Sequence, residues 1–287
     1  MRLWQTRDVA RTVEELLPRT MSQCCVGFVE SYRQTQNFVF FVTEVVTRSD
    51  ETRRIAIEAL LHGASPEERQ RLEEDRAKGN TATNALRRYA QLILETIITR
   101  TVDNYLTYVA ELLATVFRTR PEMLRSAEQV PLEFVLKHDN MDDLLGALAE
   151  RRVERLAYSG MGRLAKDLED TIGFSLFDSP GDLERAMRLV EDRNLIVHNR
   201  AVVNSTYLRR LPGSGRRIGE RLVFDVNATF ADVDFLAKMA VLADVRATEK
   251  WSLPVVPFGL ERRPHRALSR SRPKPVPRSA TTRPPRV

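Results

Sequence analysis

The residues best suited to chemistry in this chain are Arg193, Asn194 and His198, which lie close together in the sequence. Histidine is the side chain whose unperturbed pKa lies nearest neutrality, so it gives or takes protons at physiological pH. Arginine offers a planar pair of N–H donors that matches a phosphate group. Together these residue types fit phosphodiester chemistry at neutral pH.

A helix predicted over about 181–199 positions these residues, and Ser179-Pro180-Gly181-Asp182 forms its cap. Asn194 falls near the middle of an apolar stripe on this helix, while Arg193 and His198 lie roughly 70° to either side. The apolar members of the stripe are Leu183, Met187, Val190, Val197 and Ala201. Three polar groups therefore interrupt or border the face that is expected to be buried.

Polar groups on a buried face need partners, because an unpaired guanidinium or amide is costly away from water. One explanation is structural: Glu191, Asp192 or another helix satisfies Arg193 and Asn194. The other is functional: the face is a site for a phosphate-bearing ligand or a partner subunit. The sequence leaves both open.

The Arg-Asn-x-x-x-His arrangement near the end of an amphipathic helix is similar to the motif of the HEPN superfamily (higher eukaryotes and prokaryotes nucleotide-binding). The likeness continues past the motif and resembles the RiboL-PSP-HEPN branch, over about residues 83–249. The segments that carry it are Arg193–Asn199, Val203-Asn204, Tyr207-Leu208, Gly219–Leu222 and, upstream, Tyr105–Phe117 with Pro121 and Leu124.

This resemblance implies an all-α, HEPN-like helical bundle that dimerises and cuts RNA without a metal or other cofactor. On that mapping Arg193 holds the scissile phosphate, and Asn194 orients the histidine or the phosphate. His198 acts in proton transfer, so that the ribose 2′-hydroxyl attacks the phosphorus and leaves a cyclic phosphate. The family also implies a role as a toxin or phage-defence effector, with an antitoxin or other regulatory protein as partner. The alternative is a non-catalytic HEPN dimerisation scaffold or RNA-binding module.

The reaction itself favours a homodimer. Such cleavage is best served by both a general base and a general acid, and this chain offers one convincing histidine. Two copies that meet across a two-fold axis supply two, with the apolar stripe as the seam. We therefore expect a composite active site.

One position departs from the pattern of some HEPN toxins, which carry a modified tyrosine two residues after the histidine. Arg200 occupies that position here, so control by that modification is not expected. Arg200 and Asn199 are instead candidate contacts to phosphate or RNA. The other histidines, at positions 62, 138 and 265, are most simply surface or capping residues.

Nearly everything before residue 250 shows helical spacing. Ser65-Pro66-Glu67-Glu68 is a capping box, and Arg120-Pro121 interrupts a helical pattern that begins at Thr83. Further helices are predicted at about 121–126, 140–158, 160–171 and 228–249. A non-helical stretch precedes the last of these and carries the turn Pro212–Gly215 and the alternating run Arg221–Asp225. The chain divides into an N-terminal helical module (1–80), a HEPN-like helical domain with a short extended or turn insertion (81–250), and a tail (251–287).

The tail accounts for the basic character of the chain. The whole chain has 45 Lys and Arg against 39 Asp and Glu, and nine of those basic residues but one acidic residue fall in Ser252–Val287. The remaining 36 basic and 38 acidic groups give residues 1–251 a net charge of −2. Rich in Pro and Arg, the tail is expected to be disordered. It is either a solubilising segment or an electrostatic arm for RNA or another acidic partner.

Several other kinds of protein are excluded. Cys24 and Cys25 are adjacent, so they predict two small apolar thiols in a reducing compartment instead of a disulfide. The first residues form no signal peptide, and the most apolar stretch, Asn37–Val46, is too short to span a bilayer. There is no zinc spacing, no Gly-rich phosphate loop and no carboxylate cluster of metal-binding spacing. We expect a cytoplasmic protein.

Overall fold

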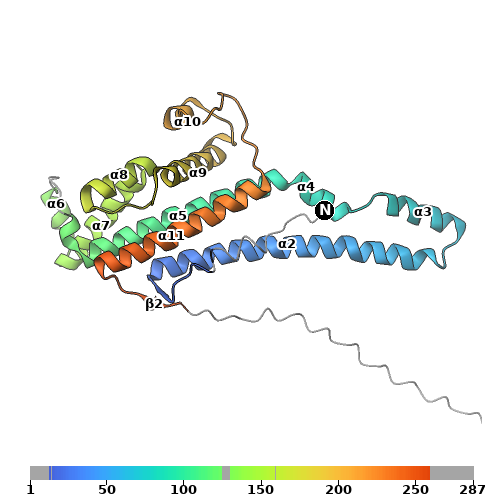
Figure 1. Cartoon of the computed structure of the whole chain (residues 1–287), viewed down its shortest axis with the longest axis horizontal. Helices are drawn as coiled ribbons and strands as arrows, with labels where there is room; N and C mark the ends of the chain where they lie inside the picture. Colours follow the sequence, from blue (N-terminus) through green and yellow to red (C-terminus); the bar gives the residue numbers. More distant parts are fainter. Residues whose placement is uncertain (1–12, 14, 125–129, 159, 259–287) are drawn as a thin grey trace, which may run out of the picture.

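Three long helices lie side by side at the centre of the computed structural model: α2 (Gln23–Leu61), α5 (Ala90–Thr119) and α11 (Val226–Trp251) (Figure 1). The structure describes residues 13, 15–124, 130–158 and 160–258. α5 is the most enclosed of the three, because α2, α11, α7 and α9 all pack against it. Its buried residues are Leu94, Ile97, Ile98, Thr101, Val102, Tyr105, Tyr108, Val109, Leu112, Leu113, Val116 and Phe117. The fold is all-α, as the sequence predicted.

A second group of helices covers the other side of α5. α8 packs between α7 and α9, and α10 lies against the end of α9 (Figure 1). These elements are η1 (Pro121–Leu124), α6 (Leu132–Val135), α7 (Met141–Tyr158), α8 (Met161–Ile172), α9 (Pro180–Asn199) and α10 (Ser205–Arg210). The predicted start of α9 is confirmed, since Ser179 accepts a hydrogen bond from the Asp182 amide.

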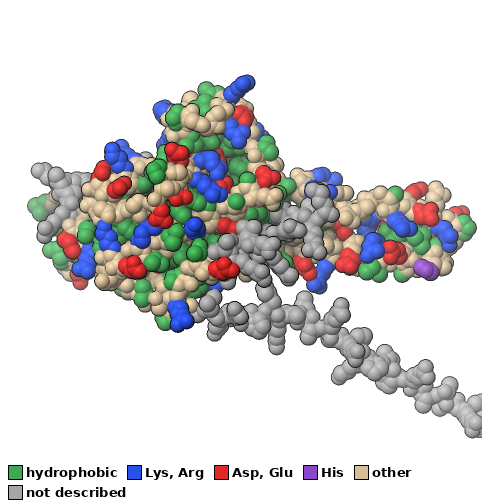
Figure 2. Space-filling view, viewed as in Figure 1, with side chains coloured by type: hydrophobic (Ala, Val, Ile, Leu, Met, Phe, Trp, Pro, Cys, Tyr) green, Lys and Arg blue, Asp and Glu red, His purple; other side chains and the backbone are tan. Residues whose placement is uncertain are grey.

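The two halves of α2 have different surroundings. The first half is buried against α5 and α11, with Phe28, Val29 and Tyr32 in the core. The second half runs out beside α3 (Pro66–Ala77) and α4 (Thr81–Arg88) as a projecting arm (Figure 1). α3 buries none of its residues, and side chains of both charges cover the arm (Figure 2). The predicted capping box at Ser65 and Glu68 is confirmed.

One buried core continues across the predicted boundary at residue 80. That boundary coincides with the turn at Gly79-Asn80 between α3 and α4. The core, however, joins residues 13–39 to α5, α8, α9 and α11. A hydrogen bond also joins the N-terminal segment to α11: the Ser22 amide donates to the buried Asp244 at 2.9 Å.

The long helix predicted from Thr83 to about residue 117 is divided at Tyr89 into α4 and α5. Asp50 of α2 accepts hydrogen bonds from the Ala82 and Thr83 amides at 2.9 Å, which holds the start of α4 against α2. α5 then follows the core, and its Gln91 side chain is tied to the backbone of Phe224 at 2.7 and 2.9 Å. Apolar residues recur at helical spacing on both sides of Tyr89, so the sequence pattern alone does not reveal the bend.

Two further segments differ from the sequence expectation. Residues 205–210, in the stretch expected to be non-helical, form α10, and the run Arg221–Asp225 makes one isolated bridge, between Arg221 and Val202. The start of the expected tail is ordered: β1 (Thr20–Met21) pairs antiparallel with β2 (Val256–Pro257), and Phe258 is buried. The Phe258 amide donates to the Arg19 carbonyl at 2.9 Å. Residues 259–287 of the tail lie outside the described residues.

The cysteines behave as predicted. Cys24 and Cys25 are free and buried on α2, and burial raises the pKa of the Cys24 thiol to about 11. Neither thiol is therefore ionised at neutral pH, and both pack as small apolar groups. Within the described part of the chain, no helix is both long enough and apolar enough to cross a membrane.

Asp234 gives the fold a testable pH dependence. Burial raises the pKa of this carboxyl to about 6, although it accepts a hydrogen bond from Tyr32 Oη at 2.7 Å. The folded state then holds a proton that the unfolded state has lost, so stability falls as pH rises from about 4 to about 6. Relative to wild type, Asp234→Asn is expected to gain about 1–2 kcal/mol of unfolding free energy over this range, allowing for partial exposure. Urea unfolding from pH 4.5 to 7.5 measures the free energy of unfolding of both proteins. If the two values change with pH in parallel, the raised pKa of Asp234 is wrong.

Candidate functional site

The end of α9 is shaped by a tight turn. Arg200 and Ala201 both adopt positive φ, 53° and 59°, a conformation that non-glycine residues rarely take. The Asn199 side-chain amide donates to the Val202 carbonyl, and the Leu222 amide donates to the Ala201 carbonyl at 2.8 Å. The chain therefore reverses at once and brings α10 back beside the last turns of α9.

His198 faces the space between α9 and α10. Its side chain is exposed and borders a hollow of about 320 Å³. Residues from both helices line this hollow: Glu191, Asn194, Leu195, His198, Asn204, Thr206, Tyr207 and Arg210. Of the three residues singled out from the sequence, Asn194 and His198 thus share one hollow.

Arg193 is on the other flank of α9. Its Nε lies 2.7 Å from Asp103 Oδ1 of α5, and the Arg193 side chain is 24% exposed. Its Nη1 donates to Asn194 Oδ1 at 3.2 Å, while Asn194 Nδ2 donates to Glu191 at 3.4 Å. Within one chain, therefore, Arg193 and His198 do not converge on the same hollow.

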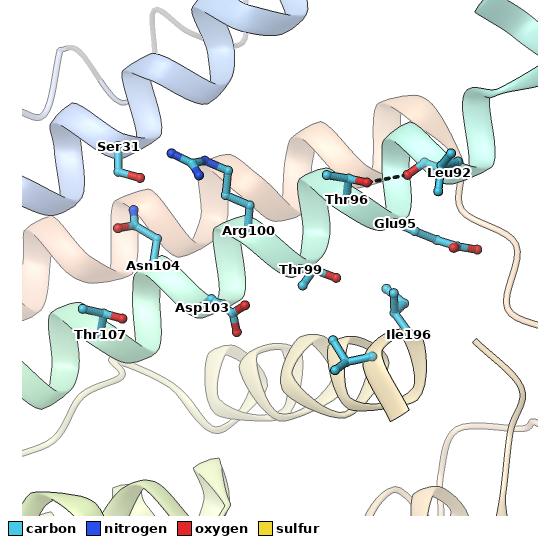
Figure 3. Close-up of a pocket in the computed structure, with 11 residues that line it drawn as sticks. Ser31, Leu92, Glu95, Thr96, Thr99, Arg100, Asp103, Asn104, Thr107 and Ile196 are labelled. Carbon is cyan, nitrogen blue, oxygen red and sulfur yellow. Dashed lines mark hydrogen bonds between the residues drawn. The ribbon is translucent and has the colours of Figure 1, made fainter. Parts of the chain in front are cut away.

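Asp103 belongs to an open groove of about 570 Å³ that runs along α5 between α2 and α9 (Figure 3). Figure 3 shows Asp103 on the side of α5 that faces α9. Arg100 points toward α2, where its Nε donates to Thr35 Oγ1 at 3.2 Å. At one end of the groove Leu92 and Val197 are 61% and 47% exposed, beside the carboxylate of Glu95.

Sequence reasoning missed Arg210 as a member of the site. Arg210 Nη1 lies 2.9 and 3.1 Å from the two carboxylate oxygens of Glu191, which is buried on α9. The Arg210 side chain remains 45% exposed beside His198. Two adjacent arginines, Arg209-Arg210, were visible in the sequence, but α10 was not predicted, so no face could be assigned to them.

Asn199 and Arg200, the other candidate contacts, have different positions. Asn199 is half-buried and its side-chain amide serves the turn. Arg200 is exposed at the end of α9. Arg200 is thus free to meet a ligand, whereas Asn199 holds the backbone that positions His198.

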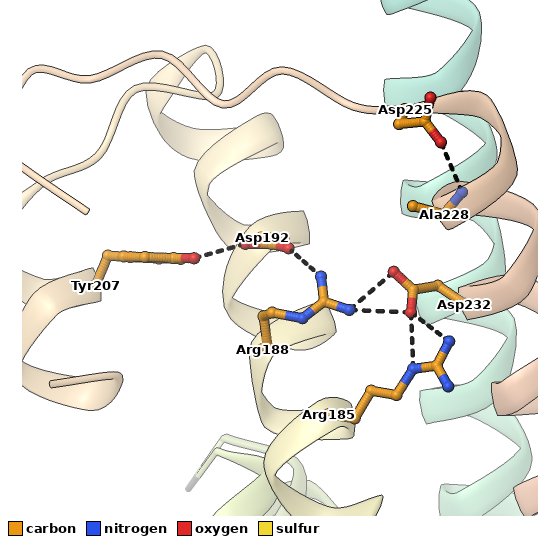
Figure 4. Close-up of polar contacts among 7 residues, drawn as sticks. All are labelled: Arg185, Arg188, Asp192, Tyr207, Asp225, Ala228 and Asp232. Atoms are coloured by element: carbon orange, nitrogen blue, oxygen red, sulfur yellow. Dashed lines mark hydrogen bonds and ion pairs between the residues drawn. The ribbon is translucent and has the colours of Figure 1, made fainter. Parts of the chain in front are cut away.

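A polar network with buried acidic residues and half-exposed arginines fixes α10 and α9 to α11 (Figure 4). Tyr207 Oη donates to Asp192 Oδ1 at 2.8 Å, and Arg188 bridges from Asp192 at 3.0 Å to Asp232 of α11 at 2.8 Å. Arg185 donates to the same Asp232 at 2.8 Å. Burial raises the pKa of Asp192 despite these donors. The network holds Tyr207, which lines the hollow that contains His198.

Comparison with protein-family models, with curated proteins and with solved structures gives no match to this chain. Among the described residues, no three His, Cys, Asp or Glu side chains are grouped so that they could hold a metal ion. The HEPN resemblance therefore stays an expectation drawn from the residues themselves.

Tyr207 provides a test of the network. Tyr207→Phe removes the donor to a buried carboxylate, so we expect unfolding free energy to fall by about 1–3 kcal/mol. Amide hydrogens of residues 203–222 are expected to exchange faster. Tyr89→Phe is the matched control, since Tyr89 is 61% exposed. Equal stability and exchange in the two variants would mean that the bond to Asp192 does not hold α10.

Proposed function

We propose that the chain is an endoribonuclease that cleaves RNA through attack of the ribose 2′-hydroxyl, without a metal ion. The observation that carries the proposal is the exposed imidazole of His198 in a hollow that also contains Asn194 and Arg210. A proton-transfer group, an amide and a guanidinium that face one space form a set suited to a phosphodiester.

In the proposed reaction the 2′-oxygen attacks the phosphorus and the bond from phosphorus to the 5′-oxygen breaks. The products are a 2′,3′-cyclic phosphate and a free 5′-hydroxyl. His198 moves a proton, either from the 2′-hydroxyl or to the leaving 5′-oxygen, and a guanidinium stabilises the charge that develops on the phosphate. Asn194 lies one turn from His198 on the same side of α9 and is placed to orient the phosphate.

The role proposed for Arg193 requires it to exchange Asp103 for phosphate. Asp103 is 44% exposed, and an ion pair of that exposure contributes only about 0–1 kcal/mol. A charge-assisted pair of hydrogen bonds to a phosphate is stronger, so the exchange is favourable when RNA is bound. Arg193 and Arg210 would then approach the substrate from the two flanks of α9.

The proposal includes a second copy of the chain that completes the site. The apolar stripe of α9 as a whole does not form this seam, because Val190 and Ala201 are buried within the chain itself. In support of a narrower seam, Val197 of the stripe is 47% exposed, and Leu92 lines the same groove. An apolar edge next to His198 fits the two-fold seam that would supply a second histidine. Regulation by a protein partner such as an antitoxin follows from the family resemblance alone.

A second candidate function is a non-catalytic scaffold or RNA-binding module. The ion pair between Arg193 and Asp103 favours it, because that pair joins α9 to α5 and thus has a structural use. In this case His198 and Arg210 would bind RNA without cutting it. Cleavage assays separate the two functions.

The first test is cleavage of total RNA and tRNA in EDTA by wild type and His198→Ala. We expect wild type to leave cyclic phosphate ends and the variant to be slower by at least about 100-fold, the usual contribution of a general acid or base. His62→Ala is the matched control, because His62 is also exposed but stands at the end of α2. Cleavage by His198→Ala at the wild-type rate would refute the catalytic assignment. RNA binding without cleavage by wild type would favour the scaffold.

If Arg210 contacts the RNA phosphate, replacing it should slow cleavage more than replacing its neighbour Arg209. Arg210→Gln is expected to reduce cleavage at low RNA concentration by about 10–100-fold, since a hydrogen-bonded charge contributes about 1.5–3 kcal/mol. Arg209→Gln, an exposed neighbour outside the hollow, is expected to stay within about two-fold of wild type, because a solvated charge at a distance contributes little. Initial rates on one RNA measure both. If the two variants cut equally fast, Arg210 serves only to pair with Glu191.

A further inference from the structure

The outer face of α2 carries an apolar stripe that is exposed within the described part of the chain. Phe38, Phe41 and Val45 follow one another at helical spacing, and they are 63%, 62% and 48% exposed. Val39, between them, is 5% exposed and packs in the core. At 100° per residue, the three exposed residues lie roughly 100–160° around the helix from Val39. The stripe therefore points away from the body of its own chain.

Such a stripe requires a physical explanation. Each of the two phenylalanines exposes on the order of 100 Å² of mostly apolar surface, and contiguous apolar surface of this kind marks an interaction site. Beyond the stripe, α2 also exposes Ile55 and Leu60, whereas the neighbouring α3 is charged and buries none of its residues. The stripe begins where α2 leaves the core and adjoins residues that α5 and α11 already cover.

Charges at the two ends of the stripe point to its occupant. Glu30 lies before Phe38 and Arg48 lies after Val45, on the same side of α2. Both side chains are exposed; Arg48 is 63% exposed although it also pairs with Glu44 of its own helix. The stripe is thus acidic at one end and basic at the other, with aromatic residues in the middle.

An antiparallel partner helix of the same sequence matches this pattern. With a two-fold axis between Val39 and Phe40, Phe38 of one copy meets Phe41 of the other. The same axis brings Glu30 within one residue of the level of Arg48 in the second copy, at both ends of the contact. A parallel arrangement would place like charges together.

We propose that the outer face of α2, centred on Phe38 and Phe41, binds the same face of a second copy of this chain in an antiparallel pair. This contact gives the N-terminal helices a role of their own. It is distinct from the seam proposed near His198, because α2 and α9 lie on opposite sides of α5 and α11 (Figure 1). The contact is small for a permanent dimer, so it forms with micromolar affinity.

Sedimentation equilibrium from 1 to 200 µM of the full chain tests the contact. As concentration rises, we expect the mass of wild type to approach an even multiple of 32.9 kDa, and that of Phe41→Asp to approach half the wild-type value at 200 µM. Phe40→Asp is the matched control: Phe40 is 45% exposed on α2 but lies outside the stripe, so its mass is expected to equal that of wild type. A wild type that stays at 32.9 kDa, or a Phe41→Asp variant of wild-type mass, overturns the proposal.

Reversing the charges of Glu30 and Arg48 distinguishes a second copy of the chain from any other partner. These substitutions leave the apolar residues of the stripe unchanged. Glu30→Arg and Arg48→Glu, made separately, each oppose like charges across the two-fold axis, so each is expected to weaken assembly by about 5–10-fold in dissociation constant. The double variant restores opposite charges and is expected to recover most of this loss. Helix content by circular dichroism confirms that each variant folds. A double variant that assembles no better than the weaker single variant overturns the antiparallel register.

Discussion

The enclosure of α5 by apolar side chains from four neighbouring helices governs what the rest of the molecule can do. Leu94, Leu112 and Val116 are fully buried, and full burial of a large apolar side chain contributes about 1.5–3 kcal/mol. The charged residues of α5 all lie at its edges, where they can meet other helices. Asn104 donates to the Phe28 carbonyl at 3.0 Å, and Asp103 meets Arg193. Because Asp103 lies at the edge of α5 that faces α9, it pairs with Arg193 on the flank of α9 away from the hollow.

α9 shows how one helix serves two neighbours at once. Toward α5 and α8 it buries Ala186, Leu189 and Val190, whereas its last turns bury Asp192 and Leu195. Leu195 belongs to a second, smaller apolar cluster with residues after the helix, Ala201, Val203, Tyr207 and Leu222. Because α9 packs against α5 and α8 on one side and against the smaller cluster on another, two separate flanks of the helix remain accessible. His198 lies on the flank that α10 borders, and Arg193 on the flank that α5 borders.

The candidate site is thus made by a chain reversal and not by the helix alone. Arg200 and Ala201 accept a strained backbone conformation, and the hydrogen bonds of Asn199 and Leu222 hold that conformation. Arg210 then returns to the level of Glu191, from the far end of α10. A ligand in the hollow would meet side chains from both α9 and α10. Its binding would therefore depend on the network from Tyr207 to Asp232, which holds these two helices together.

Local interactions determined what could be predicted from the sequence. The caps at Ser65 and Ser179, the interruption at Pro121 and the all-α class depend on residues within one turn of each other, so spacing alone reveals them. Helical periodicity also predicted helix at Phe38 and Phe41, but it cannot tell a face that packs inside the chain from one left outside. The bend at Tyr89, the helix α10 and the pairing of Arg193 with Asp103 were decided by tertiary contacts. Asp50, Asp103 and Glu191 make those contacts across long stretches of chain, and no local pattern encodes which partner a charged side chain will meet.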